Sequence, residues 1–463
     1  MSESKVLVLG FDGASPRLID QWIDDLPAFR AMRERGVYGE TIPPTPAQTP
    51  VAWTTFMTGN NPGNHGIFSF ALRRKGTYER DIIRPDMIRS NTLPRILNDA
   101  GRKVAMINIP MTDTDKVNGF IVPGFMSLKQ GIAYPPSVKE KIHRKFGIER
   151  ILGDLEVETL ERVQSDPDLF FEKVDELTDQ MAEVSLWLSQ EEPWDFFMVV
   201  FMGLDRVQHF FWEYIDATHR FHKVGKYGDL AKRCYRRFDK IVSDFTRSLE
   251  DDTTVIVLSD HGFCPVHTEL ILNDYLEDKG FLTGVSGKVD VEKSQAISYG
   301  YGDIWLNLKG REPAGLIGAG EEYEATRTKI VQYLSGLSVN GEKAVKDVKR
   351  REDLWCGGYL SDAPDLTAIF KVGFQAARRP ELSGKDAPTR HTNDNPRWSG
   401  GHDGTHDPED VPGTITMSGP GIRRGKRVRL NMWDLAPTIL KLMKIDSVNR
   451  MDGKPLDLLE RTA

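Results

Sequence analysis

The stretch "KVLVLGFDG", residues 5–13, gives the first indication of the fold. It is a run of aliphatic and β-branched residues that stops at a turn containing glycine and aspartate, as a buried strand does where it meets a loop. The stretches "WDFFMVVFMGLD" (194–205) and "TTVIVLSDHGF" (253–263) have the same form. An acidic residue closes each of the three runs: Asp12, Asp205 and Asp260. We therefore expect three buried strands that each lead to a carboxylate.

Helical periodicity separates these strands. Residues 15–36 and 229–251 carry apolar side chains at a spacing of three to four and stop near glycine or acidic turns. Alternation of strands and helices predicts an α/β fold, with a mainly parallel sheet covered by helices on both faces. Ligands of such sheets bind beyond the carboxyl ends of the strands, so we expect the three acids to converge on one crevice.

Two regions interrupt the alternation. Residues 129–190 are charged, have helical periodicity and lack a strand signal, so we expect a helical cap or an excursion from the sheet. Residues 270–395 mix short strand-like runs, one helix-like run and a polar segment, and we expect an insert that shapes the substrate pocket. The remaining residues, 1–128, 191–269 and 396–463, form the predicted catalytic core.

Composition limits the function classes. The chain has 463 residues, 61 basic and 68 acidic, and a net charge of −7, with no basic stripe of the kind that binds a nucleic-acid polymer. The cysteines Cys234, Cys264 and Cys356 have no metal or redox spacing, which favours a reducing compartment. There is no targeting leader and no apolar window of about eighteen residues, so we predict a cytoplasmic protein without a membrane span. The oligomeric state cannot be read from the sequence.

Candidate metal ligands follow two of the strands. Asp205 and His209 are four residues apart and face the same side if the chain turns helical, although such a pair is more often a surface hydrogen bond. Asp260 and His261 stand at the end of an apolar strand, where burial of both is costly without a partner. A hydrogen-bonded turn is the alternative there. Mixed nitrogen and oxygen ligands suit zinc or manganese.

A late glycine-rich segment adds two histidines. "SGGHDGTHDPEDVPG", residues 399–413, contains His402 and His406 before another strand-like run. Histidines in loops are usually solvated, so this segment by itself is ambiguous.

In order and local context, these segments together resemble the alkaline phosphatase superfamily, with its type I phosphodiesterase and nucleotide pyrophosphatase branch as the nearest match. The resemblance covers residues 4–125, 190–268 and 398–460 and includes "TGNNPGNHGI" (58–67) and the tail motifs "DLAPTILKLM" and "MDGKPL". It implies a three-layer α/β/α sandwich and a metal-dependent hydrolase acting on phosphoric ester bonds. The implied substrate is a small-molecule phosphate ester.

The resemblance also implies the ligands of two divalent ions, usually zinc (Zn²⁺), with manganese (Mn²⁺) equally suited to the donors. For the first ion the implied ligands are Asp12, Thr49, Asp260 and His261. For the second ion they are Asp205, His209 and one late histidine. His406 matches by its spacing to "EDVP" and His402 by its distance to "GPGI"; we favour His406 slightly.

Thr49 is the implied nucleophile, acting through a covalent phosphothreonine intermediate. It precedes Pro50 at the start of a predicted helix, where free N–H groups and the helix dipole favour an activated hydroxyl. The alternative is an ordinary N-cap, and both roles are compatible. Thr54, Thr55 and Thr58 lie inside the helix and are expected to bond back to carbonyls or to pack. We expect His65 to support the site rather than to bind an ion.

One departure from the branch concerns the phosphoryl contact. Phosphodiesterase members often carry an asparagine three residues after the nucleophile, where this chain has Ala52. The contact must then come from the Thr49 amide, Asn61 or a basic residue such as Arg73.

Other functions remain open at this point. A phosphomonoesterase or a phosphoglycerate mutase-like phosphotransferase shares the metal core. A sulfatase is disfavoured because no cysteine stands in the Cys/Ser-x-Pro-x-Arg motif of that branch. A non-catalytic binding protein that keeps the fold is the alternative of another class, and the complete set of expected ligands argues against it.

Overall fold

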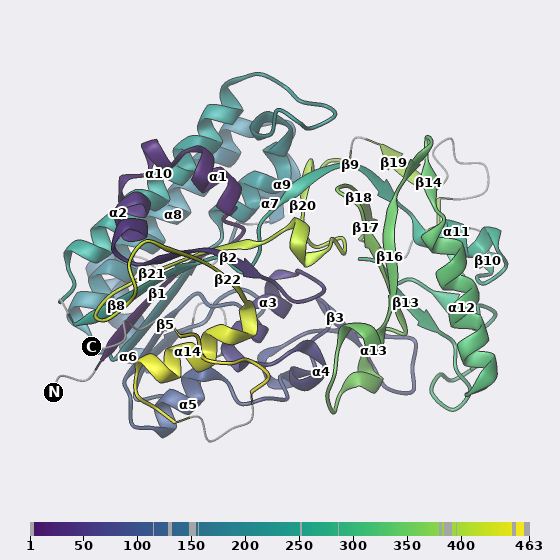
Figure 1. Ribbon diagram of the computed structural model, residues 1–463, viewed down its shortest axis with the longest axis horizontal. Helices are drawn as coiled ribbons and strands as arrows, with labels where there is room; N and C mark the ends of the chain where they lie inside the picture. Colours follow the sequence, from purple (N-terminus) through teal and green to yellow (C-terminus); the bar gives the residue numbers. More distant parts are fainter. Residues whose placement is uncertain are drawn as a thin grey trace.

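An eight-stranded sheet forms the centre of the larger lobe of the molecule (Figure 1). The computed structural model describes residues 4–113, 115–127, 132–147, 154–155, 157–250, 252–285, 287–378, 382–383, 391–394, 396–446 and 451–457. The strand order is β22-β2-β21-β8-β1-β7-β5-β6. The strands are β1 (Lys5–Phe11), β2 (Val37–Ile42), β5 (Val104–Ile107), β6 (Gly119–Val122), β7 (Phe196–Phe201), β8 (Thr253–Leu258), β21 (Gly413–Ser418) and β22 (Lys426–Asn431).

Seven of these eight strands run in one direction. β1 pairs in parallel with both β7 and β8, and β21 runs antiparallel to its neighbours β8 and β2. The ends of β1, β7 and β8 therefore lie at the same edge as the beginning of β21. The predicted α/β fold with a mainly parallel sheet is confirmed, and its topology brings four loops to that edge.

Helices cover both faces of the sheet because successive residues of the buried strands point to opposite sides. Leu7 and Leu9 join one apolar cluster, whereas Val6 and Val8 join the other. The first cluster includes side chains of α1 (Pro16–Gln21), α2 (Pro27–Arg35), α6 (Pro136–Phe146), α8 (Pro167–Glu191), α9 (Gly203–Ile215) and α10 (Lys226–Arg247). The second includes side chains of α3 (Thr49–Thr58), α5 (Leu93–Asp99) and α14 (Leu435–Leu442).

The helical stretch 129–190 differs from the expected cap or excursion. Its long helix α8 packs against β7, α9 and α10 as part of the helical layer. The reason is an apolar stripe on this otherwise charged helix. Phe170, Val174 and Val184 are buried in the first apolar cluster, which also contains Leu7 and Leu9 of β1. Within this stretch, residues 129–131, 148–153 and 156 lie outside the described residues.

The insert forms the smaller lobe (Figure 1). Its antiparallel sheet has the order β12-β13-β17-β16 and packs against α12. These elements are β12 (Ala296–Ile297), β13 (Asp303–Leu306), β16 (Val345–Arg350), β17 (Leu366–Phe370) and α12 (Glu321–Ser335). Within the insert, residues 286, 379–381, 384–390 and 395 lie outside the described part.

A separate group of strands joins the two lobes. β9 (Cys264–Leu270) leaves the core directly after β8 and pairs with β18 (Gly373–Ala376), β19 (Thr392–Asp394) and β20 (Gly400–Gly401). Because β20 pairs Gly401 with Cys264, the late histidine loop is fixed beside the chain that follows β8.

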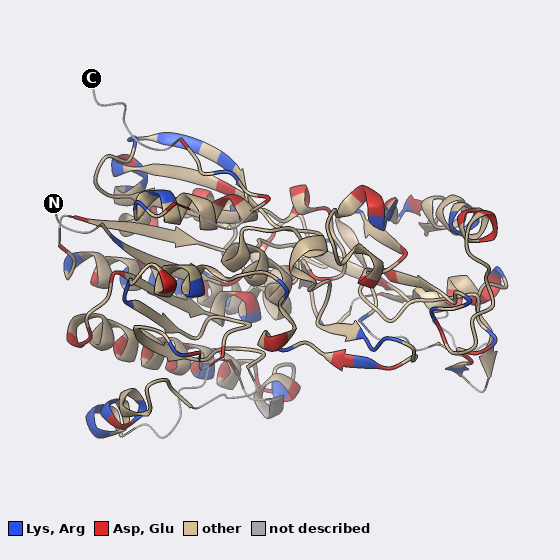
Figure 2. Cartoon of the chain, turned by 90° about the horizontal axis from the view of Figure 1, so that it is seen from below, with Lys and Arg blue, Asp and Glu red and all other residues tan. Residues whose placement is uncertain are grey.

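The remaining elements are short. They are η1 (Ile23–Asp25), α4 (Pro62–His65), β3 (Ala71–Arg73), β4 (Arg80–Ile82), η2 (Pro85–Met87), α7 (Val157–Arg162), α11 (Leu272–Asp278), β10 (Gly284–Val285), β11 (Lys288–Val289), β14 (Ser338–Val339), β15 (Glu342–Lys343), α13 (Arg351–Leu354), η3 (Leu360–Asp362), η4 (Pro408–Asp410) and η5 (Met432–Asp434). Among the described residues, none of the helices has the length and apolarity that crossing a membrane requires. Figure 2 shows basic and acidic residues interleaved along the chain in both lobes.

The placement of α8 predicts a large effect of Phe170→Ala. Phe170 is fully buried, with its ring 5.5 to 5.7 Å from those of Phe171, Phe210 and Phe211. Its truncation should lower the free energy of unfolding by about 3–5 kcal/mol, as deletion of a core aromatic does. Denaturant titration measures this, with the exposed Glu172→Ala as the control. A loss below about 1 kcal/mol for Phe170→Ala would contradict the assignment of α8 to the core.

Candidate active site

Three buried carboxylates meet at the carboxyl edge of the sheet. Asp12 follows β1, Asp260 follows β8, and Asp205 lies in the first turn of α9 after β7; each is at most 1% exposed. His261 connects two of them, because its Nε2 lies 3.1 Å from Asp260 Oδ2 and 3.6 Å from Asp12 Oδ1. The ligand atoms of Asp12, Asp260 and His261 are all within 4.8 Å of one another.

A second group lies beside the first. Asp205 Oδ1 is 3.4 Å from His209 Nε2 and 3.2 Å from His402 Nε2, and the two imidazole nitrogens are 3.2 Å apart. Asp205 and His209 occupy neighbouring turns of α9, as their spacing of four residues predicts. The ligand atoms of Asp205, His402 and His261 also lie within 4.8 Å of one another, so His261 links the two groups.

The three histidines share one hydrogen-bonding pattern. Their Nδ1 atoms lie against carbonyl oxygens: His209 against Gly400 at 3.0 Å, His402 against Ala47 at 2.6 Å and His261 against Gly262 at 3.2 Å. A carbonyl oxygen only accepts, so Nδ1 carries the hydrogen and donates it. When the ring is neutral, Nε2 then keeps a lone pair that faces the carboxylates, which is the tautomer of a metal-binding histidine.

The carboxylates present oxygen atoms suited to a cation. Among the described residues, none forms a hydrogen bond with Asp12 Oδ1, Asp205 Oδ1 or Asp260 Oδ2, although all three atoms are buried. Buried polar atoms without partners are costly, and an anionic oxygen is the costliest of them. Orphaned carboxylate oxygens and imidazole lone pairs at these distances fit divalent ions such as zinc or manganese.

The pKa values of the site reflect the same crowding of negative charge. Burial raises the pKa of Asp12 well above its ordinary value, and the carboxylates of Asp260 and Asp205 raise it further. Burial also disfavours a charged His261, but Asp260 and Asp12 outweigh it and raise the pKa of His261 to about 9. In the metal-free protein, protons on these groups therefore offset part of the negative charge.

The pKa values of Asp205 and His402 are shifted in the direction that favours metal binding. Burial opposes the charge on Asp205, yet the imidazole of His209 and the guanidinium of Arg206 hold the pKa of Asp205 well below its ordinary value. Burial, aided by the neighbouring His261, lowers the pKa of His402 to about 4. An ionised carboxylate and a neutral imidazole are the forms that bind metals.

Thr49 is the first residue of α3, and Gln48 rather than Thr49 is the N-cap. Thr49 is therefore not the N-cap that the sequence suggested as an alternative, and Pro50 occupies the second helical position instead of the first. The Thr49 hydroxyl points into the site, with Oγ1 3.3 Å from His261 Nε2. Every residue of α3 is buried, which holds this hydroxyl in a fixed place.

The other threonines of α3 support the structure. Thr54 and Thr58 donate to the carbonyls of Pro50 and Thr54, as residues inside a helix do. Thr55 Oγ1 lies 3.0 Å from Nε2 of the fully buried His65, whose Nδ1 accepts a hydrogen bond from the Ile67 amide. Burial lowers the pKa of His65 to about 3. Both of its nitrogens are thus engaged within the turn that follows α3.

The structure places His402, and not His406, beside Asp205 and His209. His406 is also fully buried, but it lies next to β17, where it forms an isolated β-bridge with Phe370. The slight preference for His406 on the basis of sequence spacing does not match this placement. The pairing of β20 with β9 decides the matter, because it fixes the residue directly after Gly401 over the site.

Asn61 and Arg73 are committed to partners outside this cluster. Asn61 is the N-cap of α4, and its amide also donates to Cys356 O at 2.9 Å and Asp452 Oδ2 at 2.8 Å. Arg73 forms a buried ion pair with Glu312 of the insert at 2.5 Å. Both side chains join separate parts of the chain, which explains their polarity without a contact to substrate.

Several side chains at the site had no signal in the sequence. Trp53 Nε1 donates to Asp12 Oδ2 at 2.9 Å, and Arg206 Nη1 donates to Asp205 Oδ2 at 3.1 Å. Tryptophan within an apolar helix is ordinarily core, and arginine next to an acidic residue on a helix is ordinarily solvated. Their direction depends on how α3 and α9 pack on the sheet.

The family model for type I phosphodiesterase / nucleotide pyrophosphatase matches residues 6–406. A solved structure of murine ectonucleotide pyrophosphatase / phosphodiesterase 5 is 15% identical with a TM-score of 0.60, covering 98% of this chain and 100% of that one. An inactive threonine-to-alanine variant of the murine protein in complex with AMP is similar at 15% identity and TM-score 0.60, covering 99% and 100%. The human counterpart is 16% identical with a TM-score of 0.58, covering 97% of each chain. No curated protein matches the sequence.

The crowded carboxylates predict opposite effects of Asp12→Asn with and without metal. The substitution removes a buried negative charge but keeps an acceptor for Trp53, so the melting temperature of the metal-free protein should not fall. Each ion present at 100 times its Kd should stabilise the wild type by about 2.7 kcal/mol. The variant should be stabilised less, because it lacks the carboxylate that binds one of the ions. Calorimetry with a chelator and then with zinc measures both, with the exposed Asp24→Asn as control. A full wild-type zinc response in Asp12→Asn would contradict the ligand assignment.

Proposed function

This chain belongs to the type I phosphodiesterase / nucleotide pyrophosphatase family, whose members hydrolyse phosphoric ester bonds, and from that premise we propose that Thr49 is its nucleophile and that two divalent ions assist it. The observation that carries the proposal is the position of the Thr49 hydroxyl, 3.3 Å from His261 Nε2 at the edge of a buried carboxylate cluster. An inactive threonine-to-alanine variant among the structural relatives is in keeping with a threonine nucleophile.

Two sets of residues would hold the ions. Asp12, Asp260, His261 and Thr49 surround the first position. Asp205, His209 and His402 surround the second. When bound, such ions lower the pKa of a coordinated hydroxyl and neutralise charge on the attacking and leaving oxygens of a phosphoryl group. Zinc is the ion that we propose, and manganese, which suits the same donors, is the alternative.

The proposed reaction has two steps. Thr49 Oγ1 loses its proton and forms a bond to phosphorus while the bond to the leaving oxygen breaks, which gives a phosphothreonine. Water then attacks phosphorus, and Thr49 leaves with its oxygen and regains a proton. With Ala52 in place of the asparagine common in this branch, the Thr49 amide at the start of α3 is the proposed donor to a phosphoryl oxygen.

A small pocket whose lining includes Gln48, the residue before Thr49, is the proposed place for the rest of the substrate. Gln48 lines it from the core together with Phe68, and Tyr301, Trp305 and Trp355 line it from the insert. Residues of the insert thus form part of the lining, and a role of residues 270–395 in shaping the substrate pocket belongs to this proposal. Its aromatic walls suit a planar group attached to the phosphate, and the AMP complex of a structural relative supports a nucleotide or a similar small phosphate ester. The cytoplasmic location stays a prediction.

Thr49→Ala should abolish turnover while leaving the metal sites largely intact. Without the oxygen nucleophile, hydrolysis of bis-nitrophenyl phosphate by the zinc-loaded protein should fall at least about a thousandfold, in line with the loss of a covalent route. Thr49→Ser keeps the hydroxyl and should retain much of the activity. Steady-state kinetics measures both variants. Metal-dependent hydrolysis by Thr49→Ala within about tenfold of the wild type would refute the nucleophile.

The aromatic pocket also predicts a preference among substrates. A nucleotide phosphodiester places its base against the aromatic walls, so its kcat/KM should exceed that of nitrophenyl phosphate, a monoester with a smaller group, by about tenfold or more. Trp355→Ala should reduce this ratio and leave the rate on the monoester nearly unchanged. A higher kcat/KM for the monoester would instead support the phosphomonoesterase alternative.

A further inference from the structure

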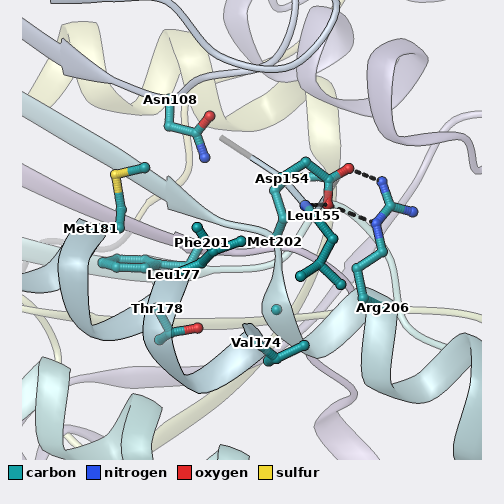
Figure 3. Close-up of a pocket in the computed structure, with 11 residues that line it drawn as sticks. Asn108, Asp154, Leu155, Val174, Leu177, Thr178, Met181, Phe201, Met202 and Arg206 are labelled. Carbon is teal, nitrogen blue, oxygen red and sulfur yellow. Dashed lines mark hydrogen bonds and ion pairs between the residues drawn. The ribbon is translucent and has the colours of Figure 1, made fainter. Parts of the chain in front are cut away.

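Arg206 lies between two carboxylates at the rim of the metal cluster. Its Nε is 2.9 Å from Asp154 Oδ1, its Nη2 also contacts Asp154, and its Nη1 donates to Asp205 Oδ2 at 3.1 Å. Figure 3 shows the Asp154 carboxylate and the Arg206 guanidinium facing each other. Only 13% of the Arg206 side chain is exposed, so this contact is mostly removed from solvent.

The two oxygens of Asp205 consequently have different environments. Oδ2 accepts the hydrogen bond from Arg206. Oδ1 faces His209 Nε2 and His402 Nε2 at 3.4 and 3.2 Å and, among the described residues, has no hydrogen-bond donor. A carboxylate restrained in this way presents one oxygen to a cation and withholds the other.

The surroundings of Arg206 favour a role in positioning over one in binding phosphate. One guanidinium faces the two negative charges of Asp154 and Asp205, so it offers no surplus positive charge to a phosphoryl group. The pocket beside the ion pair is lined by apolar side chains of α8, including Val174, Leu177 and Met181 (Figure 3). Low local polarity strengthens the ion pair and holds the guanidinium in one geometry.

We propose that Arg206, anchored by Asp154, is a positioning residue that fixes Asp205 so that the aspartate binds its ion through Oδ1 alone. The inference rests on the proposed two-ion function. Groups that orient a metal ligand typically change metal affinity by 10- to 100-fold when they are removed. Arg206 thus acts on the reaction through Asp205 and does not touch the reacting atoms.

The test is a zinc titration of the metal-free full-length protein in competition with a chelator. Arg206→Ala should lower the affinity for one of the two ions about 10- to 100-fold and leave the affinity for the other nearly unchanged. Arg206→Lys keeps the charge but cannot contact both carboxylates in the same fork geometry, so its affinity should be intermediate. Asp154→Asn loosens the anchor, and we expect a smaller loss of about three- to tenfold.

Arg327→Ala is the matched control. Arg327 is a buried arginine of the insert, 3% exposed, that pairs with Glu324 and Glu352. The Arg327→Ala variant should bind both ions with the affinity of the wild type, even if the variant is less stable. If Arg206→Ala does not fold, Arg206→Lys and Asp154→Asn decide the question by the same titration.

The outcomes separate this inference from the proposed function. A wild type that fails to bind two ions refutes the two-ion function. A wild type that binds two ions, together with Arg206 variants of unchanged affinity for both, overturns only the positioning role. A rise in KM with unaltered zinc affinity would assign Arg206 to the substrate and would also overturn it. Loss of affinity for a single ion, with partial recovery in Arg206→Lys, is the result that we expect.

Discussion

The burial of three carboxylates at one edge of the sheet is the constraint on which the rest of the site depends. Asp12, Asp205 and Asp260 are almost wholly withdrawn from water, and two unit charges 4 Å apart still repel by about 4 kcal/mol at an effective dielectric constant of 20. Neutral donors such as Trp53 and the Gly13 amide satisfy only some of the oxygens. At neutral pH, protons or bound cations must offset the remaining negative charge, and the unpartnered oxygens are arranged to receive cations.

The fold supplies that arrangement through contacts that leave little freedom. Main-chain carbonyls orient His209, His261 and His402 so that the same ring nitrogen of each faces the cluster. The strand pair β20–β9 fixes the late loop, and the buried helix α3 fixes Thr49. The proposed nucleophile and metal ligands therefore come from five separate parts of the chain, each held by backbone structure. Catalysis by positioning and charge stabilisation needs this kind of rigidity.

Much of this site could be predicted because it follows from local patterns. An apolar run that ends in an acidic residue reports both a buried strand and the end at which ligands bind, which located Asp12, Asp205 and Asp260. The choice between His402 and His406 could not be predicted, since a glycine-rich loop can follow many paths and only the pairing of β20 with β9 selects one. The contact of Arg206 with the site could not be predicted for a similar reason, because the direction of its side chain depends on Asp154, 52 residues away in sequence. Likewise, α8 has a charged surface and an apolar stripe, and only packing against β7 distinguishes a core helix from a cap.

Anomalous diffraction from crystals of the zinc-loaded protein, recorded on both sides of the zinc absorption edge, tests the central claim most directly. The account predicts two peaks about 4 Å apart, one among Asp12, Thr49, Asp260 and His261, and the other among Asp205, His209 and His402. A single peak, or a peak bound by His406 in place of His402, would contradict it.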